Sequence, residues 1–289
     1  MKNCIKIELW KALHNIYFYL AIVAGLLIVI VDVAENNEIV RNLTEQTEEY
    51  YAAGLVSGSH QGFSLFLLSL PYNGVNFATR LYLFIWPILA AMPFGASYSA
   101  ERRSGVYNQI ITRCNKRIYF IAKYIAVFVS GGAAVATPAL VDILLNAMIC
   151  PHEVIDVSNS ISSIFNGWFM AELYYTYPWV HALIWCIVLF FLGGSTAGLC
   201  LIIGAKLRLQ VLVLLVPFIV VTVWDMLFWN VFLPLFETSR QSVLFSPLTM
   251  VIAANSLPNP SWAVITVIGV LSVTGLSIGY WQVIKREFY

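Results

Sequence analysis

The stretch Glu101-Arg-Arg-Ser-Gly-Val-Tyr-Asn-Gln-Ile-Ile-Thr-Arg-Cys-Asn-Lys-Arg-Ile-Tyr-Phe-Ile-Ala-Lys123 carries six cationic side chains between two long apolar segments. Cations gather in this way in those loops of membrane proteins that remain in the cytoplasm. The whole chain of 289 residues is 60% hydrophobic and only 11% charged, with a mean hydropathy of +0.79. This composition predicts a polytopic, all-α membrane protein, and the net charge of +1 gives no reason to expect nucleic-acid binding.

Six apolar segments within one membrane domain, residues 1–289, are long enough to cross a bilayer, which needs about 20 helical residues. Their approximate bounds are 16–33, 81–99, 118–145, 179–203, 211–233 and 262–284. An even number of crossings places both termini on one side. If that side is the cytoplasm, only Arg41, Arg80 and Arg240 of the 16 cations lie outside, so the positive-inside rule favours this orientation.

A further helix is expected before the first crossing, over residues 3–15. Ile5, Leu9 and Ala12 recur there at helical spacing, while Glu8 falls on the other face. The pattern is typical of an amphipathic helix that lies in the inner headgroup layer.

Two exterior segments are expected to be irregular. In the exterior loop 34–80, an acidic first part is followed by an apolar stretch at 62–72, which is too short to span and is predicted to lie on or dip into the outer leaflet. Prolines interrupt residues 234–260, so short helices or a re-entrant excursion are predicted before the last crossing.

Small residues recur four apart inside two apolar helices, at Gly194 and Gly198 and at Gly275 and Gly279. Such pairs let helix backbones approach closely. Packing within the chain is the favoured interpretation, and dimerisation is the alternative.

No catalytic constellation is found in the sequence. A P-loop, a His-Glu-x-x-His zinc site and a nucleophile elbow are all missing. The five cysteines have neither metal-ligand spacing nor the pattern of a disulfide framework. We therefore expect no enzymatic centre, metal or bound cofactor in this chain.

Acidic residues inside apolar segments are costly and often functional. Asp142 and Asp225 lie toward the outer ends of the third and fifth crossings, and Trp224 and Trp229 flank the second acid. These four residues are possible members of a substrate path. The alternative is that each acid is hydrated near the interface or paired with a neighbouring helix.

The charged stretch resembles the permease subunits of ATP-binding-cassette type 2 exporters. An acid ends the second crossing, a glycine follows four positions later, and a short helix leads through basic residues and a tyrosine into the third crossing. The matching positions are Glu101, Gly105, Gln109, Ile110, Ile111, Arg113, Arg117, Tyr119 and Lys123. The order of segments along the rest of the chain is also similar to that family.

The resemblance implies a transport subunit that pairs with a second permease chain and with a separate cytoplasmic ATPase, which would hold ATP and Mg. It also implies that residues 102–115 form a coupling helix that docks in the ATPase. A short helix with outward cations and apolar anchors suits a groove of that kind. The expected coupling residues are Glu101, Arg102, Gly105, Val106, Gln109, Ile110, Ile111, Arg113 and Arg117.

Family substrates include polysaccharides, lipids, drugs and amphipathic peptides. The acids Glu45, Glu48 and Glu49 and the aromatic cluster around Tyr174 favour a cationic amphipathic peptide, such as a bacteriocin or cytolytic toxin, exported across a bacterial plasma membrane. A lipid or drug exporter of the same family is an alternative. A membrane scaffold or sensor that recruits a cytoplasmic partner through the same charged stretch is another.

Overall fold

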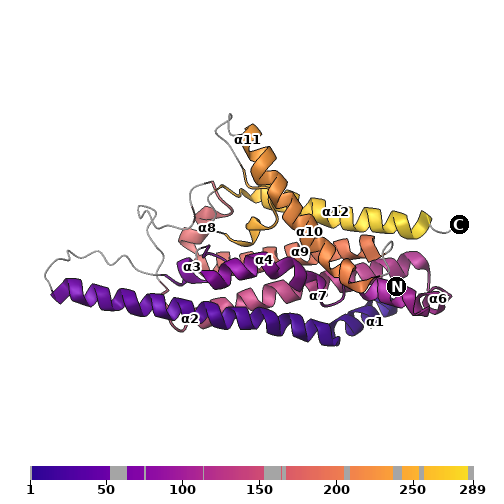
Figure 1. Cartoon of the computed structure of the whole chain (residues 1–289), viewed down its shortest axis with the longest axis horizontal. Helices are drawn as coiled ribbons and strands as arrows, with labels where there is room; N and C mark the ends of the chain where they lie inside the picture. Colours follow the sequence, from indigo (N-terminus) through magenta and orange to yellow (C-terminus); the bar gives the residue numbers. More distant parts are fainter. Residues whose placement is uncertain are drawn as a thin grey trace.

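The computed structural model describes residues 2–52, 64–74, 76–112, 114–152, 164, 167–204, 209–236, 243–253 and 257–285. Within these ranges the chain forms helices and no strands (Figure 1). The long helices are α2 (Ile16–Ala52), α4 (Phe77–Ala91), α7 (Lys116–Asn146), α9 (Pro178–Gly204), α10 (Gln210–Leu227) and α12 (Ser261–Lys285). The short ones are α1 (Lys2–Leu13), α3 (Leu65–Leu68), α5 (Ser97–Arg103), α6 (Val106–Ile111), α8 (Ala171–Thr176), a π-helix (Phe228–Phe232), α11 (Leu233–Phe236) and a 3-10 helix (Thr249–Val251).

Five of these helices, α2, α7, α9, α10 and α12, are long and apolar enough to cross a membrane. The prediction of an all-α, multi-pass membrane protein is therefore confirmed at this level. The helices run roughly along the long axis of the molecule, although α10 is inclined to it (Figure 1). The α6 end holds α1, α5, α6 and the last described turn of α12, whereas α3 and α8 lie toward the opposite end, called here the α8 end (Figure 1).

Of the six predicted crossings, the second, 81–99, agrees least with the helices of the structure. Helix α4 begins earlier, ends at Ala91 and gives way to turns at residues 92–96 before α5 begins. Pro93 lies in this break, and proline has no N–H with which to continue a helix. At 1.5 Å per residue, α4 is about 22 Å long, short of the ~30 Å core of a bilayer.

Two other segments also depart from the predictions. Helix α2 does not stop near residue 33 but continues to Ala52, where the acidic stretch is helical and carries exposed ion pairs such as Arg41 to Glu45 at 3.0 Å. The apolar segment predicted to lie in the outer leaflet is instead enclosed by protein. Leu65, Phe66 and Leu70 in it are fully buried. Its composition suits a protein interior as well as lipid, so hydropathy cannot distinguish the two.

Helices α7 and α9 form the centre of the molecule. In the most apolar window of α9, 72% of the residues are buried inside the protein, against 22% for α10. Small residues allow the two central helices to touch: a Cβ on Gly131 of α7 would lie 2.4 Å from the Ala197 Cβ of α9 and 2.7 Å from the Ala90 carbonyl oxygen of α4. Three helices therefore meet at one position that has no room for a side chain.

The recurring glycines of α9 and α12 also pack inside the chain. A Cβ on Gly194 would meet the Phe128 carbonyl oxygen of α7 at 2.7 Å, and Gly198 and Gly275 both lie against the ring of Tyr124. This confirms the packing interpretation for these three positions.

We expect Gly131→Ala to lower the free energy of unfolding by about 1–3 kcal/mol, the usual cost of overpacking a tight core. The measurement is unfolding of the detergent-solubilised chain by a denaturing detergent. Gly269→Ala in α12 is the matched control, because nothing lies within 4 Å of its added Cβ. Equal losses in the two variants would contradict the tight contact at Gly131.

Candidate functional site

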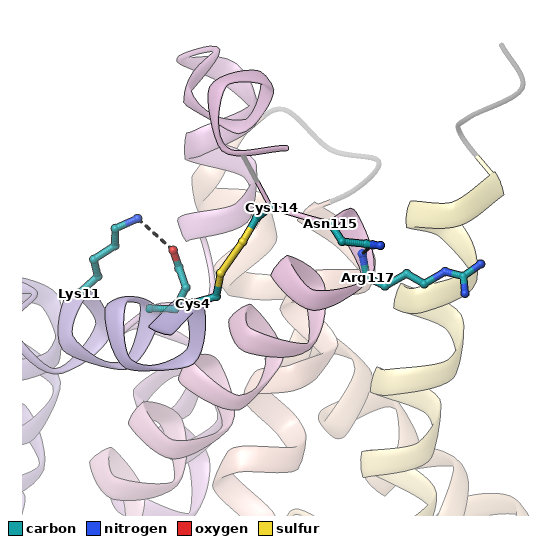
Figure 2. Close-up of a disulfide and its surroundings, with 6 residues drawn as sticks. Cys4, Lys11, Cys114, Asn115 and Arg117 are labelled. Carbon is teal, nitrogen blue, oxygen red and sulfur yellow. Dashed lines mark hydrogen bonds and ion pairs between the residues drawn. A yellow bond between two sulfur atoms is a disulfide. The ribbon is translucent and has the colours of Figure 1, made fainter. Parts of the chain in front are cut away.

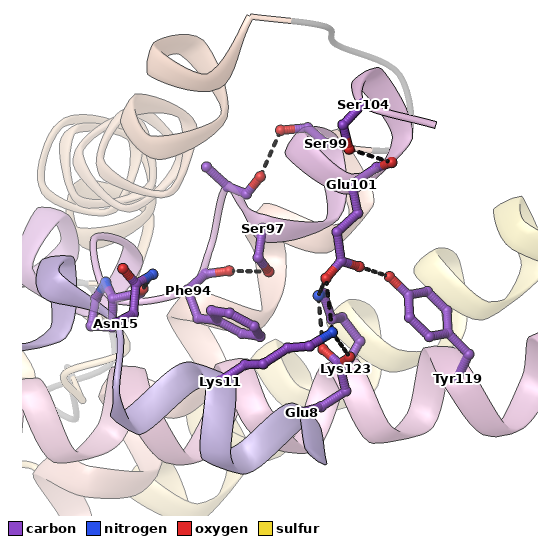
Figure 3. Close-up of polar contacts among 12 residues, drawn as sticks. Glu8, Lys11, Asn15, Phe94, Ser97, Ser99, Glu101, Ser104, Tyr119 and Lys123 are labelled. Atoms are coloured by element: carbon purple, nitrogen blue, oxygen red, sulfur yellow. Dashed lines mark hydrogen bonds and ion pairs between the residues drawn. The ribbon is translucent and has the colours of Figure 1, made fainter. Parts of the chain in front are cut away.

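A buried ion-pair cluster joins α1, α5 and α7 at the α6 end of the molecule (Figure 3). The Lys123 ammonium, fully buried, lies 2.8 Å from Glu8 Oε2 and 2.7 Å from Glu101 Oε1. Lys11 Nζ lies 2.9 Å from Glu8 Oε1 and 3.6 Å from Glu101 Oε1. Two ammonium groups thus balance two carboxylates, and we call these four residues the ion-pair cluster.

Helix geometry brings the members together. Glu8 and Lys11 are three residues apart on α1, and Tyr119 and Lys123 are four apart on α7, so each pair shares a helix face. The Tyr119 hydroxyl donates a hydrogen bond to the Glu101 carboxylate. The Phe94 ring, in the turn before α5, lies 4.5 Å from Lys123 Nζ, close enough for a cation–π contact. The ammonium therefore has partners from α1, α5, α7 and the turn before α5.

The cluster shifts the pKa of two groups that lie outside the membrane-crossing helices. Burial alone would raise the pKa of Glu101, but the charges of Lys123 and Lys11 and the hydrogen bonds from Lys123 and Tyr119 outweigh it, so the pKa lies below its ordinary value. Burial alone would lower the pKa of Lys11, but Glu8 and Glu101 raise it above its usual range. Both shifts favour the charged forms.

Three tyrosine rings attach α6 to this cluster. Tyr107 of α6 lies 5.8 Å from the Tyr98 ring of α5 and 5.7 Å from the Tyr119 ring of α7, measured between centroids, and both pairs are edge-to-face. Gly105 turns the chain between α5 and α6 with a φ of 77°, in the left-handed region that favours glycine. Helix α6 is therefore held by aromatic contacts on the side that faces the protein.

The predicted coupling residues divide into inward and outward groups. Glu101 belongs to the ion-pair cluster, and Ile110 packs against buried residues, with Ile111 half-buried beside it. The Arg102 guanidinium lies 5.9 Å from the Tyr98 ring. The exposed members are Arg102, Val106, Gln109 and Arg117, and the side chain of Val106 is 40% exposed. Arg113 lies outside the described residues. The helix in this region is also shorter than the predicted 102–115.

A cavity of about 610 Å³ separates α1 from α6. Ile7, Glu8 and Lys11 line it from α1, and Val106 and Ile110 are among the residues that line it from α6. The cavity places the ion-pair cluster beside the space between the two helices.

Asp142, predicted as part of a substrate path, lies instead in a buried polar network toward the α8 end. Its carboxylate accepts hydrogen bonds from the Leu70 N–H at 2.7 Å and from Asn146 Nδ2 at 3.0 Å. Asn36 Nδ2 donates to Asn146 Oδ1 and to Asp32 Oδ2, which links α7 to α2. Asp142 is thus paired with neighbouring segments, as the alternative interpretation expected. A role of Asp142 in a substrate path stays a prediction.

Asp225 has a different environment on α10. It accepts a hydrogen bond from the Ser246 hydroxyl, and the neighbouring Trp224 indole donates to the Phe245 carbonyl oxygen at 3.0 Å. Trp229 is half-buried against the core. Asp142 and Asp225 thus have separate sets of partners. Within the described ranges, no three His, Cys, Asp or Glu side chains are grouped so that they could hold a metal ion.

Sequence reasoning missed the surroundings of four residues. Glu8 was assigned to the polar face of a surface helix, yet it is 3% exposed and faces Lys123. Leu9 and Ala12, assigned to lipid, pack against the protein, while Ile7 and Trp10 are exposed. Asp32, near the end of the first predicted crossing, is fully buried and accepts hydrogen bonds from Asn36 and Thr79. The available signal was Lys123 itself, a cation within a predicted crossing, which requires an acidic partner.

We expect Lys123→Met to lower the free energy of unfolding by about 3–5 kcal/mol, because Glu8 and Glu101 would then face each other without the buried cation. The triple variant Glu8→Gln, Glu101→Gln, Lys123→Met should recover most of this loss. Arg41→Met, at an exposed ion pair on α2, is the control and should cost less than about 1 kcal/mol. A Lys123→Met variant as stable as the control would refute the cluster.

The stabilisation by Glu101 should also depend on pH. Because its pKa is lower in the folded chain, its contribution is complete above the ordinary glutamate value of 4.5 and is lost as the pH falls through the folded value. Glu101→Gln should therefore be less stable than wild type by about 1–3 kcal/mol at neutral pH, with the difference shrinking below about pH 4.5. Unfolding at several pH values measures this. A constant difference would contradict it, and Glu45→Gln, at an exposed site, is the control.

Comparison with known proteins does not place the chain in a family. No protein-family model, curated protein or solved structure matches it. The arrangement around Lys123 therefore has to be interpreted from its own chemistry. It is a charge-neutral, buried contact between three helices, attached to a short helix with an exposed face. These contacts hold α1, α5 and α7 against one another, and the tyrosine rings extend them to α6.

Proposed function

We propose that this chain is the membrane-spanning subunit of an ATP-binding-cassette exporter, and that α6 docks against a separate cytoplasmic ATPase. The observation that carries the proposal is the unbroken series of contacts from the exposed α6 to a membrane-crossing helix. Tyr107 contacts Tyr98 and Tyr119, and Tyr119 in turn donates to Glu101, which binds Lys123 on α7. A partner that moved α6 would move α7.

The topology that belongs to this proposal has six crossings, with α4 and the chain that follows it up to Ser99 making the second. The α6 end then faces the cytoplasm of a bacterial cell and the chain lies in the plasma membrane. Two observations support this orientation. Most Lys and Arg residues of the sequence fall in segments at that end, as the positive-inside rule requires. Helix α1 and the last described turn of α12 also lie there together (Figure 1).

The ion-pair cluster suits transmission because it resists being pulled apart. Separating one partner would leave a charge in a poorly solvated place, at a cost of several kcal/mol. Helices α1, α5 and α7 are therefore expected to move as one body when α6 is displaced. Surface ion pairs, which contribute less than about 1 kcal/mol, could not hold the helices together in this way.

The ATPase must be another chain in this proposal, because the sequence has no P-loop. ATP and Mg would be held by that partner. A second permease chain would complete the transporter. The support for it is the apolar outer surface of α10 and α12, where Val220, Val223, Ile265 and Val273 are among the exposed side chains. Lipid covers such a face equally well, so the surface permits a partner without requiring one.

We infer an amphipathic, cationic peptide as the substrate, on one observation. Glu45, Glu48 and Glu49 are exposed on the far part of α2, which extends beyond the other long helices (Figure 1). The aromatic cluster that also motivated this substrate gives less support, because Tyr174 is buried and donates to the Phe66 carbonyl oxygen. A lipid or drug substrate is the alternative within the same class of transporter. A scaffold or sensor would use α6 only to recruit a partner.

The first test uses the ATPase that co-purifies with the full-length chain. We expect Val106→Asp to weaken its binding at least about tenfold, because a buried valine anchor contributes about 1.5–3 kcal/mol. Val106→Ile should bind normally. Ile110 is a poorer probe, since it packs against the core and its replacement would disturb folding. Unchanged co-purification of the Val106→Asp variant would refute docking through α6.

The behaviour of a second variant, Tyr107→Ala, distinguishes a transport subunit from a scaffold. It should still retain the ATPase but lose any stimulation of ATP turnover by an added cationic amphipathic peptide in proteoliposomes, because the contacts from α6 to Tyr98 and Tyr119 are gone. Tyr107→Phe keeps the ring and is the control. Stimulation equal to wild type in Tyr107→Ala would favour a simple recruiting role.

A further inference from the structure

A disulfide joins the N-terminal helix to the chain between α6 and α7 (Figure 2). Cys4 lies on α1, and Cys114 lies 110 residues later, directly before Asn115, the N-cap of α7. Nothing in their spacing pairs these two cysteines, so this single bond was not predicted from the sequence. Cys150, Cys186 and Cys200 are buried and unbonded.

Cys4 and Cys114 differ from the other three cysteines in accessibility. Both are half-buried, and both line the 610 Å³ cavity between α1 and α6. That cavity is large enough to admit small thiols and disulfides. The bond is therefore open to exchange with solutes, whereas the three buried free cysteines are shielded from them.

We propose that Cys4 and Cys114 form a reversible redox site that fastens α1 to the end of α6. This inference rests on the proposed function in one respect, the cytoplasmic placement of the α6 end. Disulfides persist in oxidising compartments, whereas the cytoplasm keeps accessible thiols reduced. A solvent-accessible disulfide on that side is thus a state that forms under oxidation and is lost on reduction.

Exchange with a low-molecular-weight disulfide, glutathione disulfide, supplies the chemistry. The thiolate of one cysteine attacks a glutathione sulfur, which forms a mixed disulfide and releases one glutathione thiolate. The second cysteine then attacks the protein sulfur of the mixed disulfide and releases the second glutathione. Two protein thiols are oxidised, one glutathione disulfide is reduced to two glutathione molecules, and the protons of the protein thiols pass to the released thiolates or to water.

The position of the bond decides what it controls. The Cα atoms of Cys4 and Cys114 lie 7.9 Å apart. The bond therefore joins α1 directly to the segment that follows α6. Val106 and Ile110 of α6 line the same cavity. The oxidised bond therefore limits the movement of α6 relative to α1, and the reduced pair permits it.

The test uses the full-length chain in inside-out membrane vesicles, equilibrated with either reduced glutathione or glutathione disulfide and then treated with a membrane-impermeant maleimide. Wild type should lose two labelled thiols per chain in the oxidised buffer. Oxidised wild type should carry no bound glutathione, because its two thiols bond to each other. Cys4→Ser and Cys114→Ser should each lose only one labelled thiol and carry one glutathione as a mixed disulfide, which its mass reveals, and Cys200→Ser, at a buried free cysteine, should behave as wild type. Amide exchange over residues 106–111 should be slower in the oxidised wild type than in oxidised Cys4→Ser.

Equal labelling of wild type in both buffers, or bound glutathione on oxidised wild type in place of the internal bond, would overturn the inference. A redox-dependent change in labelling that occurs only in right-side-out vesicles would also overturn it, since the pair would then lie on the exterior side. The thiol-labelling test does not measure ATPase binding or ATP turnover. If the redox site fails this test, docking of α6 is still tested separately by co-purification of the Val106→Asp variant. A failure of docking likewise leaves the thiol labelling unchanged.

Discussion

A buried ammonium group is the constraint on which the α6 end of this molecule depends. Lys123 lies within a helix long and apolar enough to cross a membrane, and a charge there is stable only with acidic partners in contact. Those partners come from two other helices, Glu8 from α1 and Glu101 from α5. The requirement therefore fixes α1 against the protein, orients the end of α5, and through the tyrosines positions α6. The charge of Lys123 thus fixes the relative positions of α1, α5, α6 and α7.

Elsewhere in the molecule, glycines, which have no side chain, let the helices pack closely. Gly131 lets α7 approach α9 and α4 so closely that a single methyl group would collide with two of them. Without water, helices in a bilayer associate through such close packing and through internal polar contacts. Both kinds of contact occur along α7, with the ion-pair cluster at one end, glycines in the middle and the Asp142 network toward the other end. Helix α7 is thereby connected to most of the fold.

The sequence was a good guide to the long helices and a poor one to their contacts. Residues 118–145 and 179–203 were predicted within two residues of α7 and α9, because a long apolar stretch has helix as its only stable form in lipid. Hydropathy could not show that Leu65 and Phe66 enter the protein, since interior and lipid are equally apolar. Neither could it pair Glu8 with Lys123, which are 115 residues apart, or Cys4 with Cys114. Such partners are chosen by tertiary packing alone.

The short helix α4 has a consequence for how the chain is made. A segment of about 22 Å that contains Pro87 and is followed by a Pro93 break is a weak signal for insertion into a bilayer by itself. Its buried face is completed by later parts of the chain, as when the Tyr82 hydroxyl donates to the Val135 carbonyl oxygen of α7. The stable position of α4 therefore depends on a helix that is synthesised after it, and a chain that ends between the two lacks that contact.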